Sequence, residues 1–317
     1  MPMDMKKKQP LLVICGPTGS GKTSLALSLA EKYPLEIISA DSRQVYRGMD
    51  IGTAKATPAE RATVPHHMID LIDPPQEFSV AEFVDLARPL IELITARGNV
   101  PCVVGGTGLY IKALVGGLAA LPTGDENLRI QLHEREKEEG PGSLFRELQK
   151  VDPVTASQLH PHNIIRIVRA LEVFILSGEK LSVLKDDHRF ADRCYATLQL
   201  APLWSREELF RRIDLRSQEM LKQGFVAEVM NLLEHYPAEL KAFQTLGYRE
   251  VIRYLKNEIS ADQMLRDIQK FTRQYAKRQL TWFRKEAEII WVDSSTESGK
   301  VIQSIDNFIL RQRSGYA

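Results

Sequence analysis

The chain predicts an α/β protein with a doubly wound parallel sheet and an inserted all-helical domain. Short, nearly continuous apolar runs alternate with helical patterns, as strands buried on both faces of a parallel sheet require. A glycine-rich loop follows the first run and leads directly into a helical pattern. A long middle stretch shows helical spacing without any convincing strand, which indicates the insertion.

The expected elements follow from this alternation in chain order. The apolar runs predict strands at Leu11–Cys15, Leu35–Ala40, Val100–Val104, Ala196–Ala201 and Ile289–Val292. Amphipathic spacing predicts helices at Thr23–Tyr33, Ala81–Ala96, Glu126–Glu139, Ser143–Val151, Ile164–Leu176, Arg206–Gln223 and Ala261–Lys285. We therefore predict a catalytic core formed by residues 1–117 and 194–317, with residues 118–193 as the helical insertion.

Composition excludes several classes of protein. The 317 residues are 44% hydrophobic and 26% charged with a net charge of +1, which is typical of a globular chain and argues against wholesale disorder. No apolar run approaches the roughly 18 residues that cross a bilayer, so we expect no membrane partner. Three cysteines without metal-ligand spacing suit a reducing cytosol, and we expect a cytoplasmic protein.

The loop after the first predicted strand matches the P-loop pattern G-x-x-x-x-G-K-[ST]. Its backbone amides can surround phosphate oxygens, Lys22 adds a positive charge, and the Thr23 hydroxyl can ligate Mg²⁺. The expected diphosphate-binding residues are Gly16, Pro17, Thr18, Gly19, Ser20, Gly21, Lys22 and Thr23. The motif is typical of nucleotide-binding, ATP-type sites, but no guanine-reading motif accompanies it, and a simple glycine turn is the alternative.

Two further loops follow predicted strands. Asp41 ends the run at 35–40, and Thr107 lies in the glycine-rich segment after the run at 100–104. Ligands of open α/β sheets bind at the carboxyl ends of strands, so these residues converge on the P-loop if their strands are neighbours. A helix N-cap for Asp41 and a turn for Thr107 are the alternatives.

The segment Arg266–Lys285 is strongly basic, with seven Lys or Arg against a single Asp. Arg266, Lys270, Arg273 and Lys277 share one helical face, while aromatic residues fall on another. Such a stripe can neutralise a nucleic-acid backbone, and we predict RNA contacts at Arg273 and Lys277. A solvated face of a core-packing helix explains the pattern equally well.

Taken together, these segments resemble the tRNA dimethylallyltransferases, also called tRNA isopentenyltransferases. The matching motifs are GPTGSGKT at 16–23, ISADSRQVYRGMDIGTAK at 38–55, PHHMID at 65–70, VGGTGLY at 104–110, RIVRALE at 166–172, GYR at 247–249 and TRQYAKRQ at 272–279. They span most of the chain in the family's order. The end of the chain lacks the Cys/His finger of eukaryotic cytosolic relatives, which implies the bacterial type.

The resemblance implies transfer of a dimethylallyl group from dimethylallyl diphosphate to N6 of adenosine 37, just 3′ of a tRNA anticodon, with release of diphosphate. It implies Asp41 as the catalytic base, Thr107 as an orienting group, Arg216 on the diphosphate, and Mg²⁺ as cofactor. The implied tRNA contacts are Asp41, Ser42, Arg43, Gln44, Thr107, Arg129, Ile165, Arg166, Ile167, Val168, Arg169, Gln244, Thr245, Leu246, Gly247, Tyr248 and Arg249. The helical insertion would hold the anticodon stem, and we expect a monomer.

Three rival functions remain open from the residues alone. An adenylate isopentenyltransferase would modify free AMP, and a small-molecule kinase would use the P-loop for ATP. Neither has an obvious use for the basic stripe or the helical insertion. A non-catalytic RNA-binding module could retain a vestigial P-loop, although the intact Lys22, Thr23, Asp41 and Thr107 argue against decay.

Overall fold

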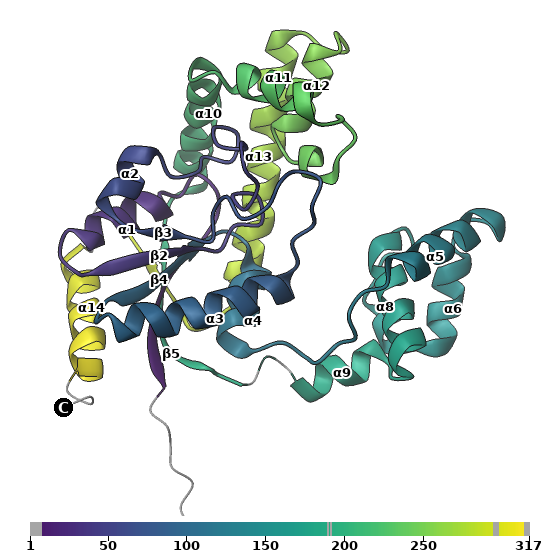
Figure 1. Ribbon diagram of the computed structural model, residues 1–317, viewed down its shortest axis with the longest axis horizontal. Coiled ribbons are helices and arrows are strands. Elements are labelled where there is room, and N and C mark those ends of the chain that lie inside the picture. Colours follow the sequence, from purple (N-terminus) through teal and green to yellow (C-terminus); the bar gives the residue numbers. More distant parts are fainter. Residues whose placement is uncertain (1–7, 189, 191, 294–297, 314–317) are drawn as a thin grey trace, which may run out of the picture. The chain divides into compact units, whose positions relative to one another are not determined.

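The computed structural model describes residues 8–188, 190, 192–293 and 298–313. The chain divides into two units, Met1–Val115 with Cys194–Ala317, and Gly116–Arg193. The first unit is built on a parallel sheet and the second is helical (Figure 1). No helix within the described ranges is long and apolar enough to cross a membrane.

The six strands of the sheet run parallel in the order β3-β2-β4-β1-β5-β6. Their bounds are β1 Gln9–Cys15, β2 Leu35–Ser39, β3 His66–His67, β4 Val100–Gly105, β5 Tyr195–Pro202 and β6 Ile289–Val292. The predicted α/β class with a parallel sheet is confirmed. The two-residue edge strand β3 was not predicted, because His-His carries no apolar signal.

Strand order explains why three loops meet. β4 lies between β1 and β2, and its register pairs Cys15 with Gly105 and Ser39 with Val104. The carboxyl ends of β1, β4 and β2 are therefore adjacent along one edge of the sheet. The loops that carry the P-loop, Thr107 and Asp41 leave from this edge, so the condition set for their convergence is met.

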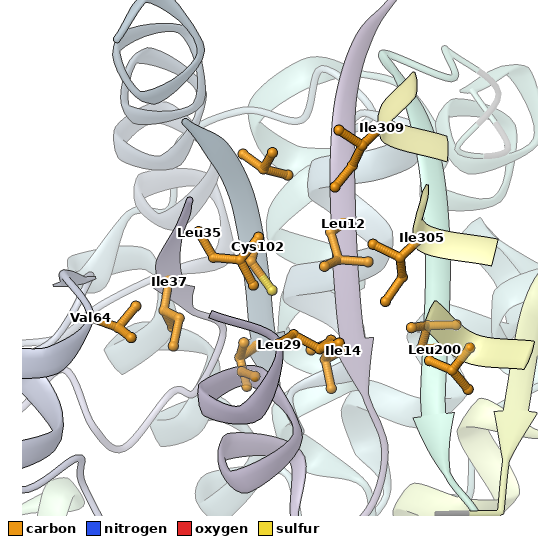
Figure 2. Close-up of a cluster of buried hydrophobic side chains, with 14 of the residues drawn as sticks. Leu12, Ile14, Leu29, Leu35, Ile37, Val64, Cys102, Leu200, Ile305 and Ile309 are labelled. Atoms are coloured by element: carbon orange, nitrogen blue, oxygen red, sulfur yellow. The ribbon is translucent and has the colours of Figure 1, made fainter. Parts of the chain in front are cut away.

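One face of the sheet is covered by the first and the last helix of the chain. Leu12 and Ile14 from β1 pack with Leu29 of α1 (Lys22–Ala30) and with Ile305 of α14 (Ser298–Arg313), as Figure 2 shows. These side chains are at most 4% exposed. Burial of apolar side chains on this scale contributes roughly 1.5–3 kcal/mol for each one, and it fixes β1 and the loop that follows it.

The remaining helices of the first unit follow in chain order. Their bounds are α2 Pro58–Thr63, α3 Val80–Ala96, α4 Gly108–Gly116, α10 Arg206–Lys222, α11 Phe225–His235, the 3₁₀ helix η1 Lys241–Gln244, α12 Tyr248–Leu255 and α13 Ala261–Phe283. Serine N-caps start three of them: Ser79, Ser205 and Ser260 each accept a hydrogen bond from the amide three residues on. The predicted long helices are confirmed to within two or three residues at their ends.

The second unit contains five helices in its described part: α5 Glu126–Glu138, α6 Ser143–Val151, α7 Pro153–Ser157, α8 Ile164–Ser177 and α9 Leu181–His188. α8 supplies most of the core, with Ile167, Val168 and Leu171 packed against Leu132 and Leu148. Asp152 caps α7 by accepting hydrogen bonds from the amide and hydroxyl of Thr155 at 3.0 and 2.6 Å. This unit thus has an apolar core of its own.

The chain leaves the first unit and re-enters it at neighbouring positions. The Cys194 amide donates to the Val115 carbonyl at 3.0 Å, and the Asp192 amide donates to the Gly116 carbonyl at 3.2 Å. These two backbone hydrogen bonds close a narrow neck. The helical unit is therefore inserted into the first unit without interrupting its sheet.

Candidate active site

The P-loop joins β1 to α1, and side chains of α10 and α13 donate to it or accept from it. Gly19 has φ +79°, and a Cβ at this position would lie 2.8 Å from Cγ1 of Ile213, so a larger residue would push α10 away. Arg212 donates to the Gly19 carbonyl at 3.0 Å, and the Trp204 indole donates to the Ser20 carbonyl at 2.8 Å. With these carbonyls occupied, the loop keeps the conformation that directs its amides toward a phosphate.

Two cations lie at the P-loop with few partners. The Lys22 ammonium donates to the Pro17 carbonyl at 2.8 Å. Arg216 makes no hydrogen bond or ion pair with any residue that the structure describes. The pKa of Lys22 is lowered to about 8, first by burial and then by the charge of Arg216, while Asp41 opposes the shift. Burial likewise lowers the pKa of Arg216. An anion placed between these groups would relieve both effects.

Asp41 and Thr107 are tied to each other through the backbone. Thr107 Oγ1 accepts a hydrogen bond from the Ser42 amide at 3.1 Å, and the Thr107 amide donates to the Ala40 carbonyl at 3.2 Å. Asp41 Oδ1 accepts from the Arg43 amide at 2.9 Å. In the described part of the chain no other group donates to this carboxylate, so Asp41 retains an oxygen that can accept a proton.

A cavity of about 410 Å³ opens beside the P-loop. Its walls include the polar groups of Thr18, Asp41 and Arg216 and the apolar side chains of Phe225 and Ile268. Tyr275 also lines it, and burial with the charge of Asp41 raises the pKa of its phenol to about 12. The volume suits a small ligand with both a charged and an apolar part.

The backbone around Gly52, which lines the cavity, is fixed by a half-buried carboxylate. Glu228 of α11 accepts hydrogen bonds from the amides of Asp50, Ile51 and Gly52 at 3.0, 2.6 and 3.2 Å. The same carboxylate accepts from the Tyr248 hydroxyl at 2.5 Å. One side chain therefore holds the segment after Asp41 against α11 and α12. The Thr245 hydroxyl, which also lines the cavity, is buried without a hydrogen-bond partner among the described groups.

A smaller cavity of about 100 Å³ lies deeper and is lined by Lys22, Thr23, Asp41, Gln44 and Arg216, among others. No cluster of three or more His, Cys, Asp or Glu side chains exists in the described ranges that could hold a metal by itself. Mg²⁺ commonly uses one or two protein oxygens together with substrate phosphates and water. The Thr23 hydroxyl fits that mode of binding.

The structure brings together most of the predicted site residues. Those that line the cavity of about 410 Å³ are Thr18, Gly19, Asp41, Ser42, Arg43, Arg216, Gln244, Thr245, Leu246, Gly247 and Arg249. Gly21, Lys22 and Thr23 line a neighbouring cavity of about 790 Å³. Gly16, Pro17 and Ser20 are buried within the loop, where they shape it.

Three residues expected to contact tRNA have buried side chains. Tyr248, Ile167 and Val168 are at most 2% exposed, so their side chains support the elements on which they lie and present no surface to an RNA. In contrast, Ile165 is 75% exposed at the start of α8, and Arg166 beside it is also exposed. Arg129 and Arg169 both donate to the buried carboxylate of Glu172.

The basic stripe of α13 is less uniform than its spacing suggests. Arg273 donates to Asp214 of α10 at 2.5 and 2.7 Å, which neutralises its charge within the protein. Lys277 is exposed and lies 5.6 Å from the centre of the Phe210 ring. The aromatic residues expected on a second face, Phe271, Tyr275 and Trp282, are only partly covered, and Met264, Ile268, Ala276 and Phe283 are the buried apolar residues of the helix.

Sequence reasoning missed Gln279, Glu228 and Trp204. The Gln279 side chain bonds to the Thr18 amide and the Gly106 carbonyl, and the other two hold the loops described above. None of them belongs to a charged cluster or a recognised ligand pattern. Gln279 ends the matched TRQYAKRQ run, which was the only available signal for it, whereas Glu228 and Trp204 lie outside every matched segment and carried no signal.

The comparisons with known proteins agree with this geometry. The family model described as IPP transferase matches residues 44–286, and that described as isopentenyl transferase matches residues 9–70. The tRNA dimethylallyltransferase 1 of Syntrophotalea carbinolica is 50% identical over 96% of this chain and 97% of its own. The tRNA dimethylallyltransferase of Geobacter metallireducens is 48% identical over 96% and 99%.

Solved structures give the same answer. A tRNA isopentenylpyrophosphate transferase from Bacillus halodurans superimposes with a TM-score of 0.71 at 38% identity, covering 98% of this chain and 99% of that one. A eukaryotic dimethylallyltransferase acting on tRNA gives a TM-score of 0.83 at 29% identity, covering 96% and 80%. These matches extend over nearly the whole chain. The chain therefore belongs to the tRNA dimethylallyltransferases.

Proposed function

We propose that this protein transfers a dimethylallyl group from dimethylallyl diphosphate to N6 of adenosine 37 in tRNA and releases diphosphate. The observation that carries the proposal is the adjacency of β1, β4 and β2. It places a phosphate-binding loop and a carboxylate around one cavity, with the Thr107 hydroxyl bonded beside that carboxylate, so that a diphosphate and an amine can meet there.

The diphosphate of the donor would lie on the P-loop amides between Lys22 and Arg216. Both cations are half-buried and have few partners among the described residues, so a diphosphate would supply the charge that they lack. Negative charge grows on the diphosphate as the C–O bond to the prenyl group breaks. Positive groups fixed around it therefore stabilise the transition state more than the bound donor.

Asp41 would serve as the general base. The exocyclic amine of adenine is a weak nucleophile and must lose a proton as the new C–N bond forms. Asp41 has a carboxylate oxygen without a donor in the described chain, and it faces the same cavity as Thr18 and Arg216. Thr107, tied to the Ser42 amide beside it, would orient the amine.

Mg²⁺ would be held by the Thr23 hydroxyl, the phosphate oxygens of the donor and water. When bound, it would neutralise part of the charge on the leaving diphosphate. The kinase alternative is not favoured, since the relatives that match over the full length are tRNA dimethylallyltransferases.

The tRNA would contact the mouth of the cavity at Ser42, Arg43 and residues 244–249, and the helical unit near Ile165, Arg166 and Arg129. Because adenosine 37 must enter the cavity, it would leave its stack before reaction. The exposed Lys277 of α13 would contact the RNA backbone. The monomeric state and the cytosolic location stay predictions.

The decisive experiment is transfer of radiolabel from dimethylallyl diphosphate, with Mg²⁺, to unmodified tRNA. Label in the tRNA fraction that is lost when adenosine 37 is replaced by guanosine supports the proposal. Free AMP included as a competing acceptor tests the adenylate alternative. Labelled AMP without labelled tRNA would replace the proposed function by that one.

A further inference from the structure

One side chain, Gln279 of α13, connects the P-loop with the loop after β4. Its Oε1 accepts a hydrogen bond from the Thr18 amide at 2.8 Å, and its Nε2 donates to the Gly106 carbonyl at 2.8 Å. The side chain is 7% exposed. A backbone N–H can only donate and a carbonyl can only accept, so the two partners fix which end of the amide is oxygen.

The contact requires glycine at position 106. A Cβ on Gly106 would lie 2.4 Å from Nε2 of Gln279, and the next nearest atom of another residue, the Gly16 carbonyl oxygen, would be 3.4 Å away. The φ angle of Gly106 does not lie in the left-handed region. Its lack of a side chain therefore serves the approach of the amide and not an unusual backbone conformation.

The same contact reaches the two residues assigned to the amine. Thr107 follows Gly106 directly, and it bonds to the Ser42 amide and the Ala40 carbonyl on either side of Asp41. Hydrogen bonds thus connect Thr18 at the diphosphate cradle, through Gln279, to Gly106, and the next residue, Thr107, bonds to the backbone on either side of Asp41. Among the described residues, no other hydrogen bond outside the strand ladder joins the P-loop to the loop after β4.

We propose that Gln279 is a positioning residue, which holds the diphosphate cradle at the distance from Asp41 and Thr107 that the transfer step needs. This inference rests on the proposed function. Misplacement of reacting groups by about 1 Å lowers rates by about 100-fold. We therefore expect Gln279→Ala to lower the single-turnover rate of prenyl transfer by about 10–100-fold while tRNA affinity changes less than about twofold.

A double-mutant cycle isolates the contact. Gly106→Ala alone places a methyl group against the amide and should lower the rate about as much as Gln279→Ala. In the double variant the methyl group has room, so the rate should equal that of Gln279→Ala alone. If the two losses multiply, Gly106 serves another purpose and the proposal fails. Gln269→Met, which removes a 3.3 Å bond from the same helix to the Asp214 carbonyl, is the matched control and should keep the wild-type rate.

Gln279→Glu distinguishes a positioning role from a merely structural one, because only the positioning role predicts a transfer rate that depends on pH. The new carboxyl still accepts from the Thr18 amide, but its second oxygen faces the Gly106 carbonyl. An ionised oxygen repels that carbonyl, whereas a protonated one donates a hydrogen bond to it. The ratio of variant to wild-type rate should therefore rise as pH falls, and a ratio independent of pH contradicts the proposal. If the wild type itself transfers no label to tRNA, the proposed function fails; if wild type and Gln279→Ala transfer equally fast, only this inference does.

Discussion

The buried Glu172 of the helical unit and the two cations at the P-loop of the sheet unit differ in the partners that the folded chain gives them. In the helical unit, the fully buried Glu172 accepts hydrogen bonds from Arg129 at 2.9 Å and from the Asp125 amide at 2.7 Å, and a further one from Arg169. Burial alone would raise the pKa of Glu172, but these donors lower it below its usual range. In the sheet unit, Lys22 and Arg216 have no such carboxylate among the described residues, and burial lowers the pKa of both.

The difference separates structural charges from charges kept for a ligand. A buried charge with a complete set of partners contributes to folding and has little left to offer a substrate. A buried charge without partners destabilises the ligand-free protein and gains its partners on binding. The same residue types therefore have different roles, and the number of hydrogen bonds that each one makes in the folded chain distinguishes them.

The largest effect that would test this contrast is at Asp41, the acid that lies near the two P-loop cations. Asp41→Asn keeps the size of the side chain but removes the base, so turnover should fall by about 10²–10⁴-fold. Affinity for tRNA, measured by filter binding, should stay nearly unchanged. Turnover at the wild-type level would remove Asp41 from the role of base.

Arg216→Met should weaken binding of dimethylallyl diphosphate by about 10–100-fold, since a charge-assisted bond is lost. The same change removes a half-buried charge that has no partner in the described chain, so the ligand-free protein should melt at the same temperature or higher. Calorimetric titration with a non-reactive donor analogue and thermal melting measure the two quantities. A clear loss of stability in the absence of ligand would contradict the contrast.

Glu172→Gln is the counterpart in the helical unit. The change leaves Arg129 and Arg169 with a weaker acceptor, and we expect it to destabilise the protein by about 1–2 kcal/mol. Binding of the donor should not change, because Glu172 lies in the other unit. Urea unfolding followed by circular dichroism measures the first effect, and the same titration as above measures the second.

Lys22 also predicts a dependence on pH. Its pKa is about 8 without ligand, and a bound diphosphate stabilises the charged form and raises that value. Binding above pH 8 therefore takes up a proton, so affinity should fall by up to about tenfold per pH unit as pH rises. Below about pH 8 the lysine is already charged, and this dependence should vanish. A flat profile from about pH 8 to about pH 9.5 would show that Lys22 does not titrate there.

The smallest effect concerns the basic stripe. Lys277→Ala should reduce the slope of log affinity against log salt for tRNA by about 1, as loss of one phosphate contact does. Arg273→Ala should change the slope less, because its charge is already neutralised by Asp214. Equal changes for both variants would mean that the ion pair opens when RNA binds.

The sequence predicted the elements that local patterns of residues define, and it missed those that depend on contacts between distant parts of the chain. The strand runs and the P-loop are local patterns, and the first and last predicted strands agree with β1 and β6 to within two residues. The helices α2, α4, α7, α9, α11, α12 and α14 were not predicted. α2 and α7 are only 6 and 5 residues long, so neither completes two turns of apolar periodicity.

The candidate site shows the same limit. The motifs identified the loops, and strand order then brought them together. The Arg273–Asp214 pair joins residues 59 positions apart, and Gln279 reaches Thr18 across 261 positions. Neither contact has a local signature, since each depends on how α13 packs in the folded chain.

The neck at Val115 and Cys194 has a consequence for how such enzymes can diversify. Entry and exit of the helical unit are already joined by backbone hydrogen bonds, so a short turn could replace everything between them without reshaping the sheet. Evolution could therefore gain, enlarge or discard the helical unit in one event while the site beside β1 stayed unaltered. A shortened chain of this kind would keep all the residues of the candidate active site. That site alone would then select the acceptor.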